Sequence, residues 1–256
     1  MRGLSGAIVE DNGSGTVKKT GGIVERTIEQ GQWIVAHGGN MFPQVHEFLP
    51  DGYVMEELEF IEYWDTDVSF NVSALKTHVW SQPAVVPPTK NTAELLKAKM
   101  AHTIDKYLHG LVSPGTRAAI LTNANNAGKQ ALFLRHCLTH GDPTAENVMR
   151  RRGNGYVFID PIGASEVVPD SPAVDIGKML QSAYGWEDAK YSNGIIAYRH
   201  SDVKNEFIGK DDEELFAAGE YWAVVHVMRA VPYVLRGVPD ALPRVLKVLE
   251  RSIERW

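Results

Sequence analysis

The order of local patterns along this chain restricts the folds that it can adopt. Two turn signals divide the first 60 residues into short β-prone runs: an Asn-Gly pair at residues 12–13 and Pro-Asp-Gly at residues 50–52. An Asn-Gly pair between two such runs is the strongest short-range signal for a hairpin. Residues 21–40 lie between the two pairs of runs and have roughly helical apolar spacing, so we expect one helix there, interrupted or ended near Gly31 or Gly38.

The patterns beyond residue 60 are mainly helical. After a proline-rich break at residues 81–90, helical spacing covers residues 92–111, 114–138, 171–186 and 211–256, the last of these split near residues 237–239. We therefore predict an α+β chain, with a strand-rich N-terminal part at residues 1–60 and a larger helical part at residues 61–256 that contains one hairpin.

The composition excludes several classes of protein. A chain of 256 residues with 44% hydrophobic content can bury a substantial core, and no apolar run approaches the length of a membrane span. The single cysteine, Cys137, excludes an internal disulfide framework and a cysteine-based zinc cluster, and we expect it to be a core residue. A formal charge of −6 argues against binding to nucleic acid through its phosphates. We expect a cytoplasmic protein with no nucleic-acid or membrane partner.

The stretch "LTHGDPTAENVMRRRGNGYVFIDP", residues 138–161, contains the densest group of chemically useful side chains. Residues 147–160 have the pattern of a hairpin with a glycine-containing turn, and a turn centred between residues 153 and 154 places Asn147 opposite Asp160. An amide oxygen and a carboxylate can hold Mg²⁺ together with water and phosphate oxygens. Asp142 precedes the hairpin, where it can face whatever the metal holds.

These residues resemble the catalytic signature of the aminoglycoside phosphotransferase and choline kinase family, which has a two-lobed protein-kinase-like fold. The matching segments are "HGDPTAEN" and "VFIDP". The resemblance implies that Asp142 orients or deprotonates an acceptor hydroxyl, and that Asn147 and Asp160 bind Mg²⁺. It implies transfer of the γ-phosphate of ATP to a small molecule such as a sugar, an amino-sugar or an amino-alcohol. Asp175 and His140 are expected to support the catalytic loop without taking part in the chemistry.

The resemblance also implies a phosphate-binding lysine on the third strand of the family's fold and an acidic residue on the first helix that pairs with it. Lys19 is the expected phosphate lysine. The resemblance implies a small apolar residue under the adenine two positions before this lysine, and Val17 shares a strand face with Lys19, while Lys18 points to the opposite face. Lys18 remains the alternative. Glu29 is the expected partner, with Glu25 one turn away as the alternative.

Two further nucleotide contacts are implied at the ends of the N-terminal part. A glycine-containing turn would approach the phosphates, and the backbone of a hinge segment would bind adenine. The turn residues are Gly3, Ser5 and Gly6, and the hinge residues are Glu56, Glu57 and Leu58.

The acceptor is the least determined part of the hypothesis. Acidic and aromatic residues alternate between residues 184 and 233, which favours a cationic or polyhydroxylated ligand. A kinase acting on a protein hydroxyl is an alternative, and so is a nucleotide-binding pseudokinase, although the three motif residues are all present. Pro161 departs from the family pattern after the metal aspartate, so the shape of that loop is uncertain.

Overall fold

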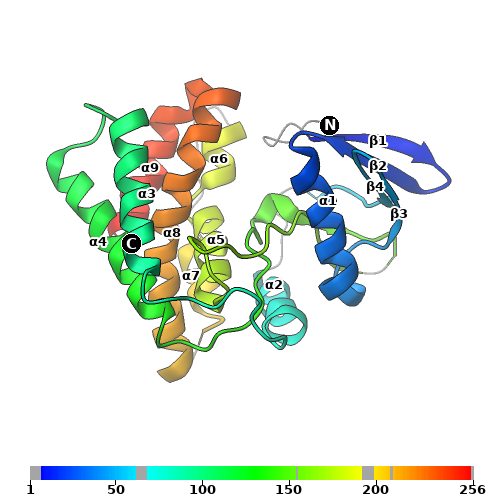
Figure 1. The fold of residues 1–256 in the computed structure, drawn as a ribbon, viewed down its shortest axis with the longest axis horizontal. Helices are drawn as coiled ribbons and strands as arrows, with labels where there is room; N and C mark the ends of the chain where they lie inside the picture. Colours follow the sequence, from blue (N-terminus) through cyan, green and yellow to red (C-terminus); the bar gives the residue numbers. More distant parts are fainter. Residues whose placement is uncertain (1–6, 62–67, 154, 192–198, 208–209, 255–256) are drawn as a thin grey trace.

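The computed structural model describes residues 7–61, 68–153, 155–191, 199–207 and 210–254. They form two lobes, with a small sheet and one helix on one side and a larger group of helices on the other (Figure 1). The predicted glycine turn residues Gly3, Ser5 and Gly6 lie outside the described residues.

The first lobe is built on a four-stranded antiparallel sheet with the strand order β1-β2-β4-β3. The strands are β1 (Ala7–Gly13), β2 (Thr16–Gly21), β3 (Val45–Leu49) and β4 (Gly52–Glu56). Both predicted hairpins are confirmed. Ser14, between two glycines, has a φ of 56°, in the left-handed region that a tight turn of this kind requires.

Helix α1 (Val24–Trp33) packs against this sheet and runs on as a π-helical segment, Ile34–Gly38. The helix therefore passes through Gly31 and ends at Gly38, one of the two expected positions. Gly31 lies directly on the ring of Tyr53, because a Cβ atom there would be 2.8 Å from Tyr53 Cδ1. Glycine at this position permits close packing and does not break the helix.

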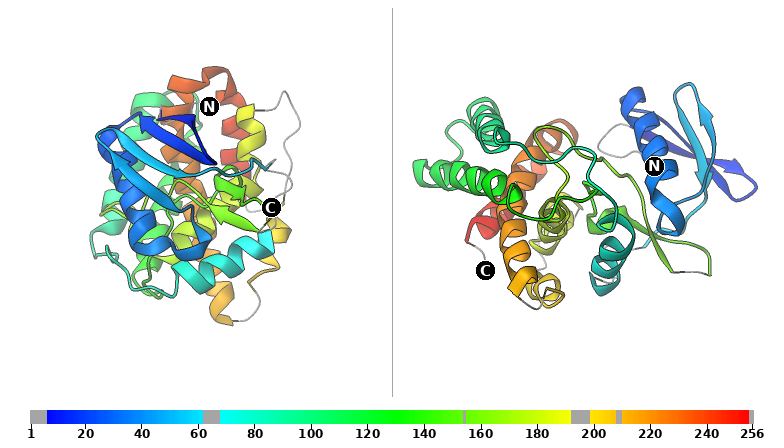
Figure 2. Two further views of the ribbon diagram at one scale, coloured as in Figure 1. Left: turned by 90° about the vertical axis from the view of Figure 1, so that its right-hand side faces the viewer. Right: turned by 60° about the horizontal axis from the view of Figure 1, so that its bottom comes forward.

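The second lobe is helical, with a hairpin of β5 (Val148–Arg150) and β6 (Tyr156–Phe158) that reaches toward the first lobe (Figures 1 and 2). Its helices are α2 (Val68–Ala74), α3 (Thr92–Tyr107), α4 (Pro114–Ala131), α5 (Pro172–Ala183), α6 (Trp186–Tyr191), α7 (His200–Lys204), α8 (Lys210–Gly237) and α9 (Leu242–Glu254). Pro114 and Pro172 both lie in a first helical turn, where the missing N–H costs nothing. No helix within the described ranges is long and apolar enough to cross a membrane.

Helices α5 and α8 form the centre of the helical lobe and approach each other closely (Figure 1). A Cβ atom on Gly177 would lie 2.5 Å from Trp222 Cβ, and one on Gly219 would lie 2.3 Å from Ile176 Cγ2. Both glycines therefore allow the helices to touch nearly backbone to backbone. Around them the core is continuous, and Cys137 is buried within it as expected.

Candidate active site

Two buried carboxylates, those of Asp175 and Asp170, accept hydrogen bonds from the loop at residues 139–142. Asp175, in the first turn of α5, accepts hydrogen bonds from the backbone N–H groups of His140 at 3.1 Å and Gly141 at 2.8 Å. The indole of Trp80 donates to the same carboxylate at 2.9 Å. Burial raises the pKa of Asp175 to about 7, while these three donors favour the ionised form. Asp175 thus braces the loop, as the sequence predicted.

Asp170 is a second brace, and the sequence analysis missed it. One oxygen accepts from the N–H and hydroxyl of Thr139 at 3.0 and 2.9 Å, and the other accepts from the N–H groups of Val85 and Val86 at 2.7 and 2.8 Å. Its place just before the Ser-Pro start of α5 was the only available signal. Gly141 fits the braced loop because its φ is 81° and a Cβ atom there would lie 2.9 Å from the carbonyl oxygen of Gly163.

Asp142 lies at the rim of this loop and is fixed on both carboxylate oxygens. Asn147 Nδ2 donates to Asp142 Oδ2 at 3.0 Å, and Lys178 Nζ lies 2.8 Å from Oδ1. Burial favours the neutral acid, but the charge and hydrogen bond of Lys178 outweigh it, so the pKa of Asp142 lies below its ordinary value. The side chain is a carboxylate at neutral pH. The sequence analysis did not identify Lys178, although it lies three residues after Asp175 on the same helix.

His140 contributes an uncharged ring beneath the loop. Its Nδ1 accepts a hydrogen bond from the N–H of Asp142 at 3.1 Å, so the ring proton is on Nε2. Burial lowers the pKa of His140 to about 4, although the nearby charges of Asp142 and Asp160 favour protonation. As expected, His140 supports the loop and is not placed to exchange protons near neutral pH.

The hairpin register differs by one residue from the predicted one. The strand pairs are Val148 with Phe158 and Arg150 with Tyr156, and the carbonyl of Asn147 accepts from the N–H of Ile159 at 2.9 Å. Asn147 is therefore paired with Ile159 and not with Asp160. The turn is longer than assumed, because the innermost hydrogen bond joins Arg151 to Gly155 across three residues.

Asp160 follows this ladder with a φ of 58°, a conformation that a residue other than glycine rarely adopts. The chain turns sharply there, and the carboxylate forms an ion pair with Lys19 of β2. The ion pair joins the two lobes at the site. Lys19 is only 3% exposed, and its Nζ also donates to Gln30 Oε1 at 3.1 Å.

The α1 partner of Lys19 is Gln30, where the sequence analysis expected Glu29. Among the described residues, the side chains that contact Lys19 Nζ through hydrogen bonds or ion pairs are Asp160 and Gln30. Glu25 and Glu29 are both exposed. Neighbouring helix positions differ by about 100° around the axis, so the residue that faces Lys19 is the one after Glu29.

The predicted hinge segment connects β4 to the second lobe. The carboxylate of Glu56 binds Arg151 of the hairpin, with 2.6 Å between Glu56 Oε1 and Arg151 Nη2. The N–H groups of Glu56 and Glu57 donate to the carbonyls of Gln44 and Gly15, both at 2.9 Å. The side chain of Glu56 thus joins the lobes, and the Leu58 N–H has no hydrogen bond within the described part of the chain.

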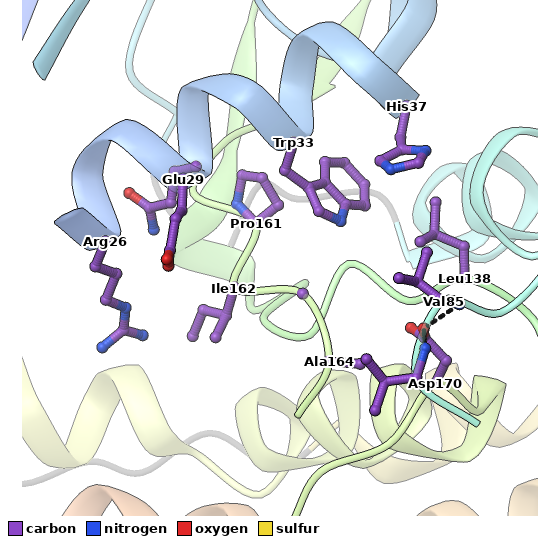
Figure 3. A pocket seen from close by; sticks show the side chains of 13 residues that line it. Arg26, Glu29, Trp33, His37, Val85, Leu138, Pro161, Ile162, Ala164 and Asp170 are labelled. Atoms are coloured by element: carbon purple, nitrogen blue, oxygen red, sulfur yellow. Dashed lines mark hydrogen bonds between the residues drawn. The ribbon is translucent and has the colours of Figure 1, made fainter. Parts of the chain in front are cut away.

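A pocket of about 190 Å³ lies between α1 and the segment that follows Asp160. Arg26, Glu29 and Trp33 line it from α1, and Pro161 and Ile162 line it from the other side (Figure 3). In Figure 3 the side chain of Arg26 extends from α1 toward the helices of the second lobe. Pro161 therefore forms a wall of this pocket.

Several acidic side chains expected near the acceptor are bound within the protein. Glu187 accepts from Ser182 Oγ at 2.6 Å and is buried, and Glu220 pairs with His200 at 3.2 Å. Asp212 lies 3.4 Å from Lys76 Nζ. Within the described ranges, no group of three or more His, Cys, Asp or Glu side chains is arranged to hold a metal ion.

Comparison with known proteins gives one family. The profile of a family described as "Phosphotransferase enzyme family" matches residues 74–208, which is more than half of the chain. A search of curated protein sequences finds no match.

Several solved structures share the fold. A GDP complex of aminoglycoside 2'-phosphotransferase-IIIa has a TM-score of 0.64 at 12% identity, over 97% of this chain and 89% of that one. A gentamicin complex of APH(2")-IIa has a TM-score of 0.60 at 13% identity, covering 98% and 90%. An ethanolamine kinase of Plasmodium vivax has a TM-score of 0.54 at 9% identity, covering 96% and 80%. These likenesses confirm the two-lobed, protein-kinase-like fold predicted from the sequence.

Proposed function

Because this chain belongs to the phosphotransferase enzyme family, we propose that it transfers the γ-phosphate of ATP, bound with Mg²⁺, to a hydroxyl group of a small molecule. The observation that carries the proposal is the environment of Asp142. Its carboxylate is ionised, held by Asn147 and Lys178, and mounted on a loop that Asp170 and Asp175 brace.

Asp142 is the group that meets the acceptor. Its carboxylate accepts a hydrogen bond from the acceptor hydroxyl and so aligns the oxygen with the γ-phosphorus. As the new oxygen–phosphorus bond forms and the bond to the β-phosphate oxygen breaks, the hydroxyl proton passes to Asp142 and ADP leaves. A carboxylate with a low pKa is a weak base, so orientation contributes more than early proton removal.

Asn147 and Asp160 fit the requirements for binding Mg²⁺. Both hydrogens of Asn147 Nδ2 are used by Asp142, through its carbonyl at 2.8 Å and its carboxylate at 3.0 Å. The amide orientation is therefore determined, and Oδ1 points away from Asp142 and accepts no hydrogen bond from the described residues. Asp160 adds a carboxylate that is 34% exposed. When bound, Mg²⁺ would neutralise charge on the nucleotide phosphates, with water and phosphate oxygens completing its shell.

Lys19 is the proposed phosphate ligand on the first lobe. It is buried, its amine already lies beside Asp160, and Gln30 holds it from α1. A cation in this position stabilises charge on the phosphates without solvent reorganisation. Leu58 is proposed to bind adenine through its backbone, and Gly3, Ser5 and Gly6 remain predicted phosphate contacts.

The proposal is tested by measuring ADP formation from Mg-ATP with small hydroxyl compounds and with a generic protein substrate. We expect turnover that depends on Mg²⁺ and on Asp142, and that small hydroxyl compounds stimulate. Stimulation by the protein substrate alone would show a protein kinase. Nucleotide binding without turnover under any condition would show a pseudokinase.

A further inference from the structure

Two cationic side chains lie near Asp142, and a third lines the pocket between α1 and the second lobe. Lys178 comes from α5, Arg229 from α8, and Arg26 from α1 of the opposite lobe. Arg229 is close enough to Asp142 and to Arg26 for the charge of each to influence its pKa. The acceptor must enter this region, because its hydroxyl has to reach Asp142.

Arg229 is held in a defined position by His226. His226 Nε2 lies 3.0 Å from the carbonyl oxygen of Val174, which can only accept, so Nε2 carries the ring proton. Nδ1 is then an acceptor, and Arg229 Nη1 donates to it at 3.3 Å. Burial lowers the pKa of His226 well below its ordinary value, and the charges of Lys178 and Arg229 act in the same direction. His226 stays neutral and can accept from the guanidinium over the usual pH range.

Arg229 has no carboxylate partner within the described part of the chain. Every ion pair found there involves other cations, and the two oxygens of Asp142 are already bound to Asn147 and Lys178. Burial lowers the pKa of Arg229 from its usual value, although part of the side chain remains exposed to solvent. A charged group that loses water without gaining a counter-charge is unfavourable, unless a ligand supplies that charge.

Arg26 adds a further positive charge from the first lobe. Figure 3 shows its side chain extending away from α1 toward the helices of the second lobe. Glu29, one turn later on α1, is exposed and forms no ion pair with Arg26 within the described ranges. Two guanidinium groups from opposite lobes thus lie close enough for their charges to interact.

We propose that the acceptor is an anion, a small hydroxyl compound that carries a carboxylate or phosphate group bound between Arg229 and Arg26. Guanidinium groups suit this ligand because their paired N–H donors match the oxygens of both anionic groups. This inference rests on the function proposed above and narrows its substrate class. It also departs from the cationic ligand that the sequence pattern favoured, since Glu187, Glu220 and Asp212 have partners inside the protein.

The test compares two sets of related hydroxyl compounds that carry no charge, an amine, a carboxylate or a phosphate. One set is glucose, glucosamine, gluconate and glucose 6-phosphate, and the other is glycerol, ethanolamine, glycerate and glycerol 3-phosphate. Binding in the presence of Mg-ADP and turnover with Mg-ATP are measured for each compound. We expect a carboxylate or phosphate member to exceed its neutral counterpart by about tenfold or more. Comparison of the carboxylate compound with the phosphate compound in each set shows which anionic group the site prefers.

Variants then test whether Arg229 causes the preference for an anionic acceptor. Arg229→Gln is expected to reduce the anionic-to-neutral ratio by about tenfold or more, and Arg229→Lys to restore part of it. Arg117→Gln on α4 makes the same charge change at a surface ion pair with Asp105 and should leave the ratio unchanged.

The results separate this inference from the proposed function. If the wild-type protein neither binds nor turns over Mg-ATP, the proposed function fails. If Mg-ATP is bound and hydrolysed but no anionic member exceeds its neutral counterpart, the inference alone is overturned. Equal losses for all acceptors in Arg229→Gln would also overturn it.

Discussion

The two halves of the site are held in different ways. On the acceptor side, the loop that carries Asp142 rests on two buried carboxylates. Asp175 accepts from two backbone N–H groups of the loop, and Asp170 accepts from the N–H and hydroxyl of Thr139. On the nucleotide side, Lys19 of β2 meets the second lobe through its ion pair with Asp160.

This difference indicates that the acceptor half is preorganised, while the nucleotide half is completed by its ligand. Buried, fully bonded carboxylates fix a loop because any displacement leaves polar groups unsatisfied. The Lys19–Asp160 pair can be rearranged more easily, since Mg²⁺ and phosphate would supply new partners to Asp160 and Lys19 respectively. Substitutions on the two sides should therefore have separable effects.

The largest expected effect is on turnover, from Asp142→Asn. Loss of the carboxylate should reduce kcat by about 100- to 10,000-fold, because the amide cannot accept the hydroxyl proton. The KM for ATP should stay within about threefold, since Asp142 touches the acceptor and not the nucleotide. Steady-state ADP release measures both. Near-normal turnover in Asp142→Asn would show that Asp142 does not act on the acceptor. It would also contradict the proposed separation between the acceptor half and the nucleotide half of the site.

Lys19→Met should have the next largest effect, and it should fall on the nucleotide side. We expect kcat/KM for ATP to fall by about 10- to 100-fold, because a buried cation at the phosphates is lost. Lys18→Met is the matched control on the opposite strand face and should change the value by less than about twofold. If the two variants exchange these effects, Lys18 is the phosphate lysine.

Acid should weaken the acceptor half through His140. The pKa of His140 is about 4 in the folded protein and about 6.5 in the unfolded chain, so the unfolded chain binds more protons between these values. The free energy of unfolding should therefore fall as the pH falls from 6.5 to 4, by up to about 3 kcal/mol from this group. Urea unfolding across this range measures it.

His140→Gln tests whether that slope belongs to the catalytic loop. The substitution should reduce the pH dependence of unfolding, although His226 contributes to the same range. His46→Gln changes an exposed histidine and should leave the slope as it is. An unchanged slope in His140→Gln would show that the buried ring is not the cause.

The smallest expected effects concern the helix partner of Lys19. Gln30→Ala should raise the KM for ATP by about three- to tenfold, because it removes one neutral hydrogen bond to the amine. Glu29→Gln should change it by less than about twofold, since this side chain is exposed. A larger effect from Glu29→Gln would indicate that α1 rotates when the nucleotide binds.

Local patterns predicted the elements of the fold well because turn and capping signals act over a few residues. The hairpin turns at residues 12–13 and 50–52 and the prolines at the starts of α4 and α5 are signals of this kind. The register of the β5–β6 hairpin could not be read in the same way. Two glycines allowed turns of different length, and one extra residue moved Asp160 out of the ladder.

Contacts between distant segments were the part of the site that the sequence could not reveal. Asp142 and Lys178 are 36 positions apart in the chain, and their pairing depends on the way α5 packs beneath the loop. Arg229 lies near Asp142 because α8 packs directly against α5, which Gly177 and Gly219 allow. Nothing in the local sequence around Arg229 distinguishes it from a surface arginine on a helix.

Titration calorimetry of Mg-ATP into three variants tests the division of the site most directly. Asp142→Asn should bind Mg-ATP with an affinity within about threefold of the wild-type value. Asn147→Ala should bind Mg-ATP more weakly than wild type, and Asp160→Ala should lose the Mg²⁺-dependent part of the binding. The effect of Asp160→Ala is larger because water replaces a charged ligand less easily than an amide oxygen. Wild-type Mg-ATP affinity in Asp160→Ala, or its loss in Asp142→Asn, would contradict the account.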